Sequence, residues 1–209
     1  ILFLDEFPEF SRAALETLRQ PLEEREVTVS RVEASVTYPA NFQLVAAMNP
    51  CPCGHFPDRS RCRCTDGQIT RYLQKVSGPM LDRIDICVEA SPITYGDIRS
   101  SGNNESSREI RARVEQARKI QGERFAGENI RCNGEMSGRH IRKFCWLGRE
   151  EEKFMEEIFK KLALSARMHD RILKVARTTA DLAEEEKIRL ADLCEAVSYV
   201  KSRDKFWGN

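Results

Sequence analysis

The strongest constraint on the fold is a pair of short apolar runs, each of which ends in polar side chains. Residues 1–4 lead directly into Asp5 and Glu6, and residues 42–48 lead into Asn49. Continuous apolar runs of this length are typical of strands that are buried on both faces of a parallel sheet. The sequence therefore predicts two buried strands that deliver acidic and amide side chains at their ends.

Helical patterns alternate with these strands in the first half of the chain. Ser11 can cap a helix that Pro21 ends or kinks, and Asp66 can cap another. A further short strand is expected at 84–88, where β-branched side chains alternate with polar ones. Strands joined by helices indicate an α/β layer.

Two β-branched segments between the predicted strands indicate a hairpin. Residues 27–29 and 34–38 flank a short polar stretch, which places Arg31 near the tip. Because hairpin tips are commonly solvated, a basic residue there has an ordinary structural explanation as well as a functional one.

The composition changes to Ser, Gly and Asn at 100–107, which is the best linker candidate. We expect a domain boundary there, with an α/β domain over 1–99 and a helical domain over 100–209. Beyond the linker no strand pattern is visible. Ser106 can cap a first helix, and further helices are expected at about 137–146, 149–163, 166–185 and 189–202.

Composition excludes several classes of protein. The 209 residues are 41% hydrophobic, and no apolar run approaches the roughly 20 residues of a membrane span, so no membrane partner is expected. The 34 basic and 33 acidic side chains give a net charge of +1, so any contact with nucleic acid needs a local basic patch. Eight cysteines without a recognisable signal peptide indicate a cytoplasmic protein.

The two strand ends carry the residues that a nucleotide hydrolase needs opposite its phosphate loop. Asp5 would hold Mg²⁺, Glu6 would polarise the attacking water, and Asn49 would hold that water or a γ-phosphate oxygen if its strand neighbours the first. A plainer interpretation also fits, in which the two acids cap the next helix and Asn49 forms a turn before proline.

Arg83 is the first of the basic candidates. At an exposed position, its guanidinium could reach a phosphate in a neighbouring subunit and stabilise charge that develops in the transition state. Alternatively, it pairs with Asp82 or Asp85 beside it.

Four cysteines form two closely spaced pairs, Cys51 with Cys53 and Cys62 with Cys64. Eight residues separate the pairs, which is enough to place four thiolates around one tetrahedral Zn²⁺ in a closed, structural site. Reduced free thiols and a disulfide remain alternatives, and His55 could replace one cysteine ligand.

Taken together, five motifs occur in one order that resembles the Mg-chelatase-like AAA+ ATPases of the YifB/ComM group. They are Leu2-Phe3-Leu4-Asp5-Glu6, the segment 14–23, Val27-Thr28-Val29-Ser30-Arg31, Asn49-Pro50-Cys51-Pro52-Cys53-Gly54 and the segment 77–85. The resemblance continues through Ser165-Ala166-Arg167, the segment 171–178 and Ala180-Asp181-Leu182, so that it covers nearly the whole chain.

This resemblance implies a role for each residue that matches a family motif. Asp5 and Glu6 match the Walker B acids, Asn49 matches sensor 1, and Arg83 matches the arginine finger that acts across a subunit boundary. ATP and Mg²⁺ are the implied cofactors.

Three further arginines receive roles in the same way. Arg167 is assigned to sensor 2, the lid arginine that contacts the γ-phosphate, and Arg171, one helical turn later, is the second choice. For both residues the alternative is an ordinary basic face of a helix. Arg31 would lie on the pre-sensor-1 hairpin, which in related ring helicases grips the DNA backbone.

The resemblance also implies the fold and the function of the longer protein. The fold is the C-terminal part of an AAA+ P-loop NTPase core followed by an all-helical lid. The longer protein would assemble as a ring, and a hexamer is the expected size. No Gly-x-x-x-x-Gly-Lys-Ser/Thr motif occurs in the sequence, so the phosphate loop is expected upstream of Ile1, and the chain alone is expected to be inactive. A DNA-dependent motor is the first functional hypothesis, and the ATPase subunit of a magnesium chelatase is the alternative.

Overall fold

The computed structural model describes residues 1–31, 34–91, 93, 95–99 and 105–207. Within these residues the chain forms a mixed α/β structure that divides into two compact units. The first unit contains Ile1–Ile86 and Arg203–Asn209, and the second contains Cys87–Ser202.

The first unit contains short strands and short helices. In chain order they are β1 (Leu2–Leu4), η1 (Phe7–Glu9), α1 (Arg12–Thr17), α2 (Arg19–Glu24), β2 (Glu26–Arg31), β3 (Ala34–Pro39), β4 (Leu44–Ala46), α3 (Asp66–Leu73) and α4 (Gly78–Leu81).

The described elements of the second unit are helical. They are α5 (Tyr95–Arg99), α6 (Ser107–Arg124), η2 (Asn133–Glu135), α7 (Gly138–Phe144), α8 (Arg149–Lys161), α9 (Ala166–Leu182) and α10 (Leu190–Trp207), whose last residues belong to the first unit.

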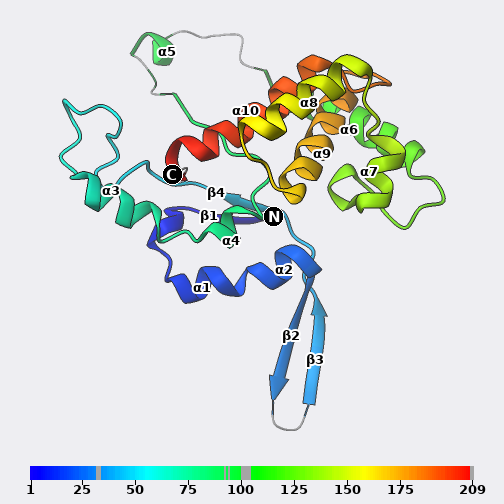
Figure 1. Cartoon of the computed structure of the whole chain (residues 1–209). Coiled ribbons are helices and arrows are strands. Elements are labelled where there is room, and N and C mark those ends of the chain that lie inside the picture. Colours follow the sequence, from blue (N-terminus) through cyan, green and yellow to red (C-terminus); the bar gives the residue numbers. More distant parts are fainter. Residues whose placement is uncertain (32–33, 92, 94, 100–104, 208–209) are drawn as a thin grey trace. The chain divides into compact units, whose positions relative to one another are not determined.

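The two predicted buried strands are neighbours in one parallel sheet. β1 pairs with β4 in a register that joins Leu2 to Leu44 and Leu4 to Ala46 (Figure 1). The pairing continues beyond the strands, because the N–H of Ala47 donates to the carbonyl of Leu4 at 2.9 Å. One face of this pair contacts an apolar cluster that includes Phe7, whereas Phe3 and Val45, on the other face, are exposed. The two strands and their parallel pairing are therefore present as predicted, but the prediction that they are buried is wrong: the inner face is only partly buried and the other face is exposed.

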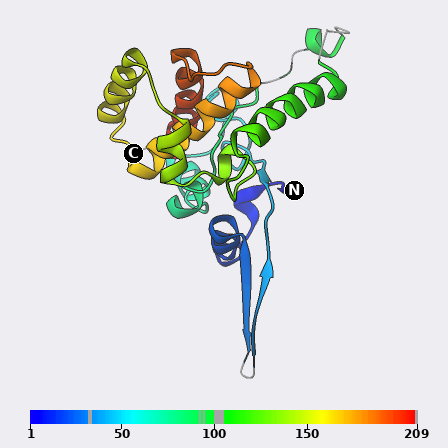
Figure 2. The same cartoon turned by 90° about the vertical axis from the view of Figure 1, so that its right-hand side faces the viewer.

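The predicted hairpin is present as β2 and β3, which pair antiparallel from Glu26 opposite Pro39 to Arg31 opposite Ala34. It projects away from α1 and α2 in both views (Figure 1; Figure 2). One face carries hydroxyl pairs, with Thr28 and Thr37 joined at 3.1 Å. Arg31 is the last residue of β2 and is exposed, and the tip itself, 32–33, lies outside the described residues.

The sequence predicts that Pro21 ends or kinks the first helix, and the structure confirms the break. The break itself lies a few residues before the proline. The helical run divides at Leu18 into α1 and α2, and Pro21 lies inside α2. A proline ring clashes with the carbonyl four residues earlier, which here belongs to Thr17, the last residue of α1.

Two local predictions in the first half are wrong. Residues 84–88 form no strand, although their side chains alternate. Alternation reports which side chains suit a pleated surface, but it does not by itself bring the backbone into a sheet. Thr65, and not Asp66, caps α3, because its hydroxyl accepts from the N–H of Gln68 while the Gln68 side chain accepts from the N–H of Thr65.

The helices predicted for the second half are confirmed, with ends that differ by a few residues. α7, α8 and α9 end earlier than expected, and α10 continues to Trp207. Ser106 caps α6 in a complete capping box with Glu109. Most of the predicted linker, 100–104, lies outside the described residues.

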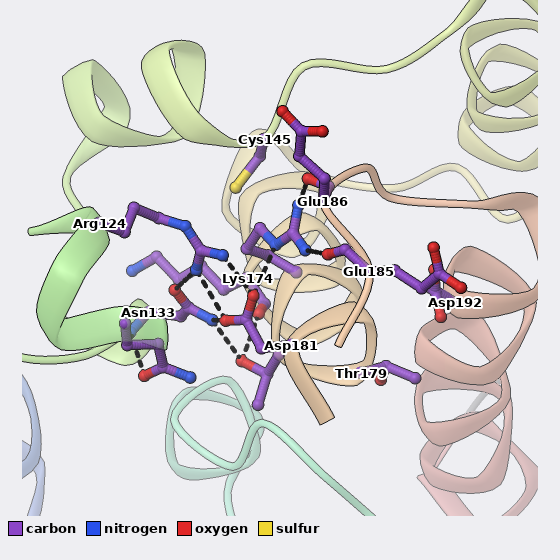
Figure 3. A network of polar contacts seen from close by, with 12 residues as sticks. Arg124, Asn133, Cys145, Lys174, Thr179, Asp181, Glu185, Glu186 and Asp192 are labelled. Carbon is purple, nitrogen blue, oxygen red and sulfur yellow. Dashed lines mark hydrogen bonds and ion pairs between the residues drawn. The ribbon is translucent and has the colours of Figure 1, made fainter. Parts of the chain in front are cut away.

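A buried carboxylate organises the helices of the second unit. Asp181 of α9 has no exposed surface and accepts hydrogen bonds from Arg124 of α6 and, at 2.8 Å, from the side-chain amide of Asn133 in η2 (Figure 3). Arg177, one helical turn before it, donates from Nε at 3.1 Å. This carboxylate therefore joins three elements that are distant in sequence.

Arg177 connects the same group to the loop after α9. Its two terminal nitrogens donate to the carbonyls of Glu185 at 2.6 Å and Glu186 at 2.8 Å. Burial lowers the pKa of Arg177 below its ordinary value, and the Asp181 carboxylate opposes that shift. The charged form is stabilised because every hydrogen bond of the group is made inside the protein.

We predict that Asp181→Asn destabilises the second unit by about 3–5 kcal/mol, because it leaves two buried guanidinium groups without their counter-charge. Urea denaturation followed by circular dichroism measures the change. Asp170→Asn is the matched control on the same helix; its carboxylate is half exposed and contacts His169, so the expected change is within about 0.5 kcal/mol. Equal stability of the two variants would contradict this role of Asp181.

Candidate functional site

The ends of β1 and β4 bring the first group of candidate residues to one edge of the sheet. Asp5 and Glu6 follow β1 directly, and Asn49 follows β4 by three residues. Because the two strands run parallel and Leu4 lies opposite Ala46, their carboxyl ends meet at the same edge. All three side chains are exposed, and they are therefore accessible to a ligand.

The backbone after β1 turns sharply and orients the two acids. Glu6 adopts a left-handed conformation with φ of 50°, and its N–H donates to a carboxylate oxygen of Asp5 at 2.9 Å. The following turn, η1, has no side-chain cap. The plainer interpretation, that these acids cap the next helix, is therefore not supported at η1, and α1 is capped by Ser11 as predicted.

Asn49 has Gly54 and Tyr72 as neighbours. A Cβ added to Gly54, which has φ of +79°, would lie 3.8 Å from the Asn49 amide oxygen, an ordinary van der Waals distance. Tyr72 of α3 is the second neighbour, and hydrogen bonding from the backbone N–H of Asn49 partly counters the rise in the pKa of its phenol. Burial is the main cause of that rise, and the charge of Glu9 adds to it.

Tyr72 is not among the site residues that the sequence predicts. It is buried, with a relative exposure of 6%, and its contact with Asn49 arises from tertiary structure. No local signal could have identified this contact, because 22 residues that include an irregular loop separate the two positions.

The cysteine-rich loop brings all four predicted ligands together. The Sγ atoms of Cys51, Cys53, Cys62 and Cys64 lie within 4.8 Å of one another. The Cys51–Cys53, Cys53–Cys62 and Cys51–Cys62 sulfurs are 3.4, 3.6 and 3.8 Å apart. Tetrahedral zinc with bonds of about 2.3 Å requires sulfurs about 3.8 Å apart, so the geometry fits such an ion.

The thiols of the cluster have different environments. Hydrogen bonds from the backbone N–H groups of His55 and Arg63 lower the pKa of Cys53 to about 6. Burial is the largest cause that raises the pKa of Cys64, to about 11, and it also raises that of Cys62. Four clustered sulfurs at these distances, without a disulfide, are what a thiolate metal site requires, and His55 lies outside the cluster.

Arg83 is held within its own unit. Its guanidinium forms an ion pair with Glu23 of α2 and donates to the carbonyl of Pro79 at 2.6 Å. The structure pairs it with Glu23 instead of the adjacent acids considered above. The side chain is only 15% exposed, and its Nε has no hydrogen-bond partner among the described residues.

The two lid candidates lie on α9, in the second unit. Arg167 is exposed in the first turn of the helix, and Arg171 is half-buried one turn later. Lys174 continues the same edge and donates to the carbonyl of Gly134 at 3.3 Å. The spacing of these three basic residues places them along one edge of α9, opposite the face that contributes Ile172 and Ala176 to the core.

A serine, a histidine and a glutamate also lie close together in the second unit. The hydroxyl of Ser137 is 2.9 Å from Nδ1 of His140, and Nε2 of His140 is 3.5 Å from Glu128. Ser137 and His140 form the capping box of α7, and Glu128 also pairs with Lys143 at 2.7 Å. These contacts are accounted for by helix capping and surface ion pairing.

No helix in the described part of the chain is long and apolar enough to cross a membrane.

Comparison with known proteins gives matches over most of the chain. Residues 1–98 match the family described as magnesium chelatase, subunit ChlI, and residues 104–200 match the one described as magnesium chelatase, subunit ChlI C-terminal. The chain is 44% identical over 200 residues to competence protein ComM of Haemophilus influenzae and 43% identical over 201 residues to a protein named YifB of Salmonella typhimurium. These alignments cover 95% of this chain but only 38% of each relative.

Proposed function

The chain belongs to the Mg-chelatase-like family, in the group of the YifB and ComM proteins, and on that premise we propose that it is the part of an AAA+ ATPase that follows the phosphate loop. In this proposal residues 1–99 complete the nucleotide-binding core and residues 100–209 form the helical lid. The observation that carries the proposal is the parallel pairing of β1 with β4, which brings Asp5, Glu6 and Asn49 to one sheet edge.

The exposed groups at that edge fit the chemistry of nucleotide hydrolysis. Mg²⁺ bound with ATP would supply charge neutralisation at the phosphates. Asp5 offers carboxylate oxygens for the ion, Glu6 would orient and polarise the attacking water, and Asn49 would hold the water or the γ-phosphate. The contact of Tyr72 with the backbone of Asn49 supports this assignment, because the segment that carries a water-positioning group has to be held in one place.

Two further roles require a neighbouring subunit or a movement of the lid. We propose that Arg83 is the arginine finger of a ring, in which it would leave Glu23 to reach the nucleotide of the next subunit. Arg167, with Arg171 as the fallback, would contact the γ-phosphate from the lid. The ring, with a hexamer as the expected size, is proposed from the family, as is the activity of the longer protein, because the chain spans 38% of its relatives.

The motor acts on DNA in our first proposal. The β2–β3 hairpin supports it, since it extends from the unit and carries an exposed cation at its far end, Arg31. One relative is named a competence protein, which is consistent with work on DNA. The alternative, the ATPase subunit of a magnesium chelatase, is favoured by the description of the matching family.

We also propose that the cysteine cluster binds one structural Zn²⁺. The sulfur separations support this, and so does the position of the loop, which begins two residues after Asn49. Zinc would stiffen the segment that carries Gly54 and so hold Asn49 at the sheet edge. Reduced thiols of this kind fit a cytoplasmic protein.

Glu6→Gln in the longer protein is predicted to preserve ATP binding and to abolish turnover, because the amide cannot polarise water while the Asp5 ligand remains. A phosphate-release assay and nucleotide-binding titration measure the two properties. Glu9→Gln is the matched control, since Glu9 pairs with Lys75 at 3.1 Å and is assigned no step. Turnover retained by Glu6→Gln would remove Glu6 from its role.

Arg31→Ala is predicted to weaken binding of forked DNA by the longer protein and to reduce the slope of log affinity against log salt by about one. Fluorescence anisotropy over a salt series measures both. Arg111→Ala, at an exposed position of α6, is the control that should leave the slope unchanged. If the wild-type protein binds no DNA even at low salt, the DNA motor is excluded and the chelatase alternative stands.

The zinc proposal predicts about one equivalent of zinc per chain in protein purified under reducing conditions. Cys53→Ser should lose the metal and lower the thermal midpoint, whereas Cys194→Ser, at an exposed position outside the cluster, should retain it. Elemental analysis and thermal unfolding measure the two effects. Less than about half an equivalent in undamaged wild-type protein would rule against the site.

A further inference from the structure

A groove lies in the first unit beside the cysteine-rich loop. Its volume is about 190 Å³, which is small compared with the roughly 300–1,000 Å³ of sites that enclose drug-sized ligands. The cysteine loop contributes Phe56 and Arg59, one face of α3 contributes Ile69 and Leu73, and the end of α10 contributes Lys205 and Phe206. The groove therefore has room for one flat group and is open to solvent on one side.

Aromatic rings and cations are paired on both sides of the groove. The guanidinium of Arg59 lies over the ring of Phe56, 5.0 Å from its centroid, and the ammonium of Lys205 lies over the ring of Phe206 at 5.4 Å. Both phenylalanines line the groove, and both residues are half-buried. Aromatic side chains in such a groove suit a further planar aromatic group.

The floor of the groove is fixed by buried contacts. Ile69 and Leu73 are one turn apart on α3, with exposures of 6% and 7%. The indole N–H of Trp207 donates to the carbonyl of Leu73 at 3.0 Å, and its ring meets that of Phe206 edge to face. The last residues of α10 are thereby held against α3, which places Phe206 opposite the cysteine loop.

The charge near the groove is balanced, and this affects how a ligand would be held. Arg61 and Arg63 are exposed on the same loop, but Asp66 pairs with Arg59, and four zinc-bound thiolates would add negative charge. Electrostatic attraction of phosphate groups therefore contributes little to binding in this groove. Stacking on the two rings is the interaction that the groove offers most strongly.

We propose that this groove binds one unpaired base of a single-stranded nucleic acid, stacked on Phe56 and Phe206. The inference rests on the proposed DNA motor and adds a second contact to it, separate from the hairpin. A base in a duplex is already stacked on its neighbours, so the groove selects single strands. Every base presents a π-face, and the contact is therefore independent of sequence.

The test uses the full chain with its zinc content verified, and a fluorescent oligothymidylate as the probe. Phe56→Leu and Phe206→Leu keep apolar side chains but remove one stacking face each. Each should weaken binding roughly ten-fold, with an unchanged salt slope. Phe159→Leu, at an exposed phenylalanine of α8, is the matched control and should bind like the wild type.

Photocrosslinking with a 5-iodouracil oligonucleotide identifies the contacted residues directly. Crosslinks at Phe56 or Phe206 in the wild-type chain, mapped by mass spectrometry, are the expected result. Phe206 packs against the cluster that contains Cys51, so the zinc content of each variant is measured together with binding to separate loss of stacking from loss of the metal site. Phe56 also donates its backbone N–H to Cys51 at 3.4 Å, which leucine retains.

Two outcomes would overturn the inference in distinguishable ways. If both leucine variants bind like the wild type while Arg31→Ala binds more weakly, the groove has no part in binding and the DNA motor stands. If the wild-type protein binds no nucleic acid at low salt, the motor and the groove fail together.

Discussion

The candidate site depends on one interaction, the parallel pairing of β1 with β4. Each strand has only three residues, so the pair is stabilised by what surrounds it: hydrogen bonds that continue past its ends and the apolar cluster around Phe7 beneath one face. The pairing decides where Asp5, Glu6 and Asn49 lie, because parallel strands end at a common edge. A shift in register by one residue would turn the side chains of a strand to the opposite face.

The cysteine-rich loop extends this edge toward α3. Cys51 is fully buried next to Tyr72, and Gly54 returns the chain to the amide of Asn49. The loop begins two residues after Asn49, so its conformation affects where that candidate residue lies. The proposed zinc site and the proposed base-binding groove therefore share this one short loop. A rigid loop would hold Asn49 at the sheet edge and would also position one wall of the groove.

In the second unit the helices are joined by a buried carboxylate instead of a strand pair. Asp181 is satisfied by two arginines and an asparagine from three elements. The sequence predicted the helices themselves, because apolar residues at helical spacing and capping boxes such as that of Ser106 are local signals. It did not predict that Arg177, on the apolar face of α9, would be buried.

The sequence by itself determined the strand ends with their polar residues, the hairpin, the order of the helices and the four cysteines, because each depends on period, propensity or spacing within about twenty residues. Only the tertiary structure decided that Leu4 lies opposite Ala46, that Arg83 pairs with Glu23, that Tyr72 contacts Asn49 and that 84–88 forms no strand. Such contacts join segments that are distant along the chain. They depend on which surfaces pack and which backbone groups find partners, and neither is encoded in a local pattern.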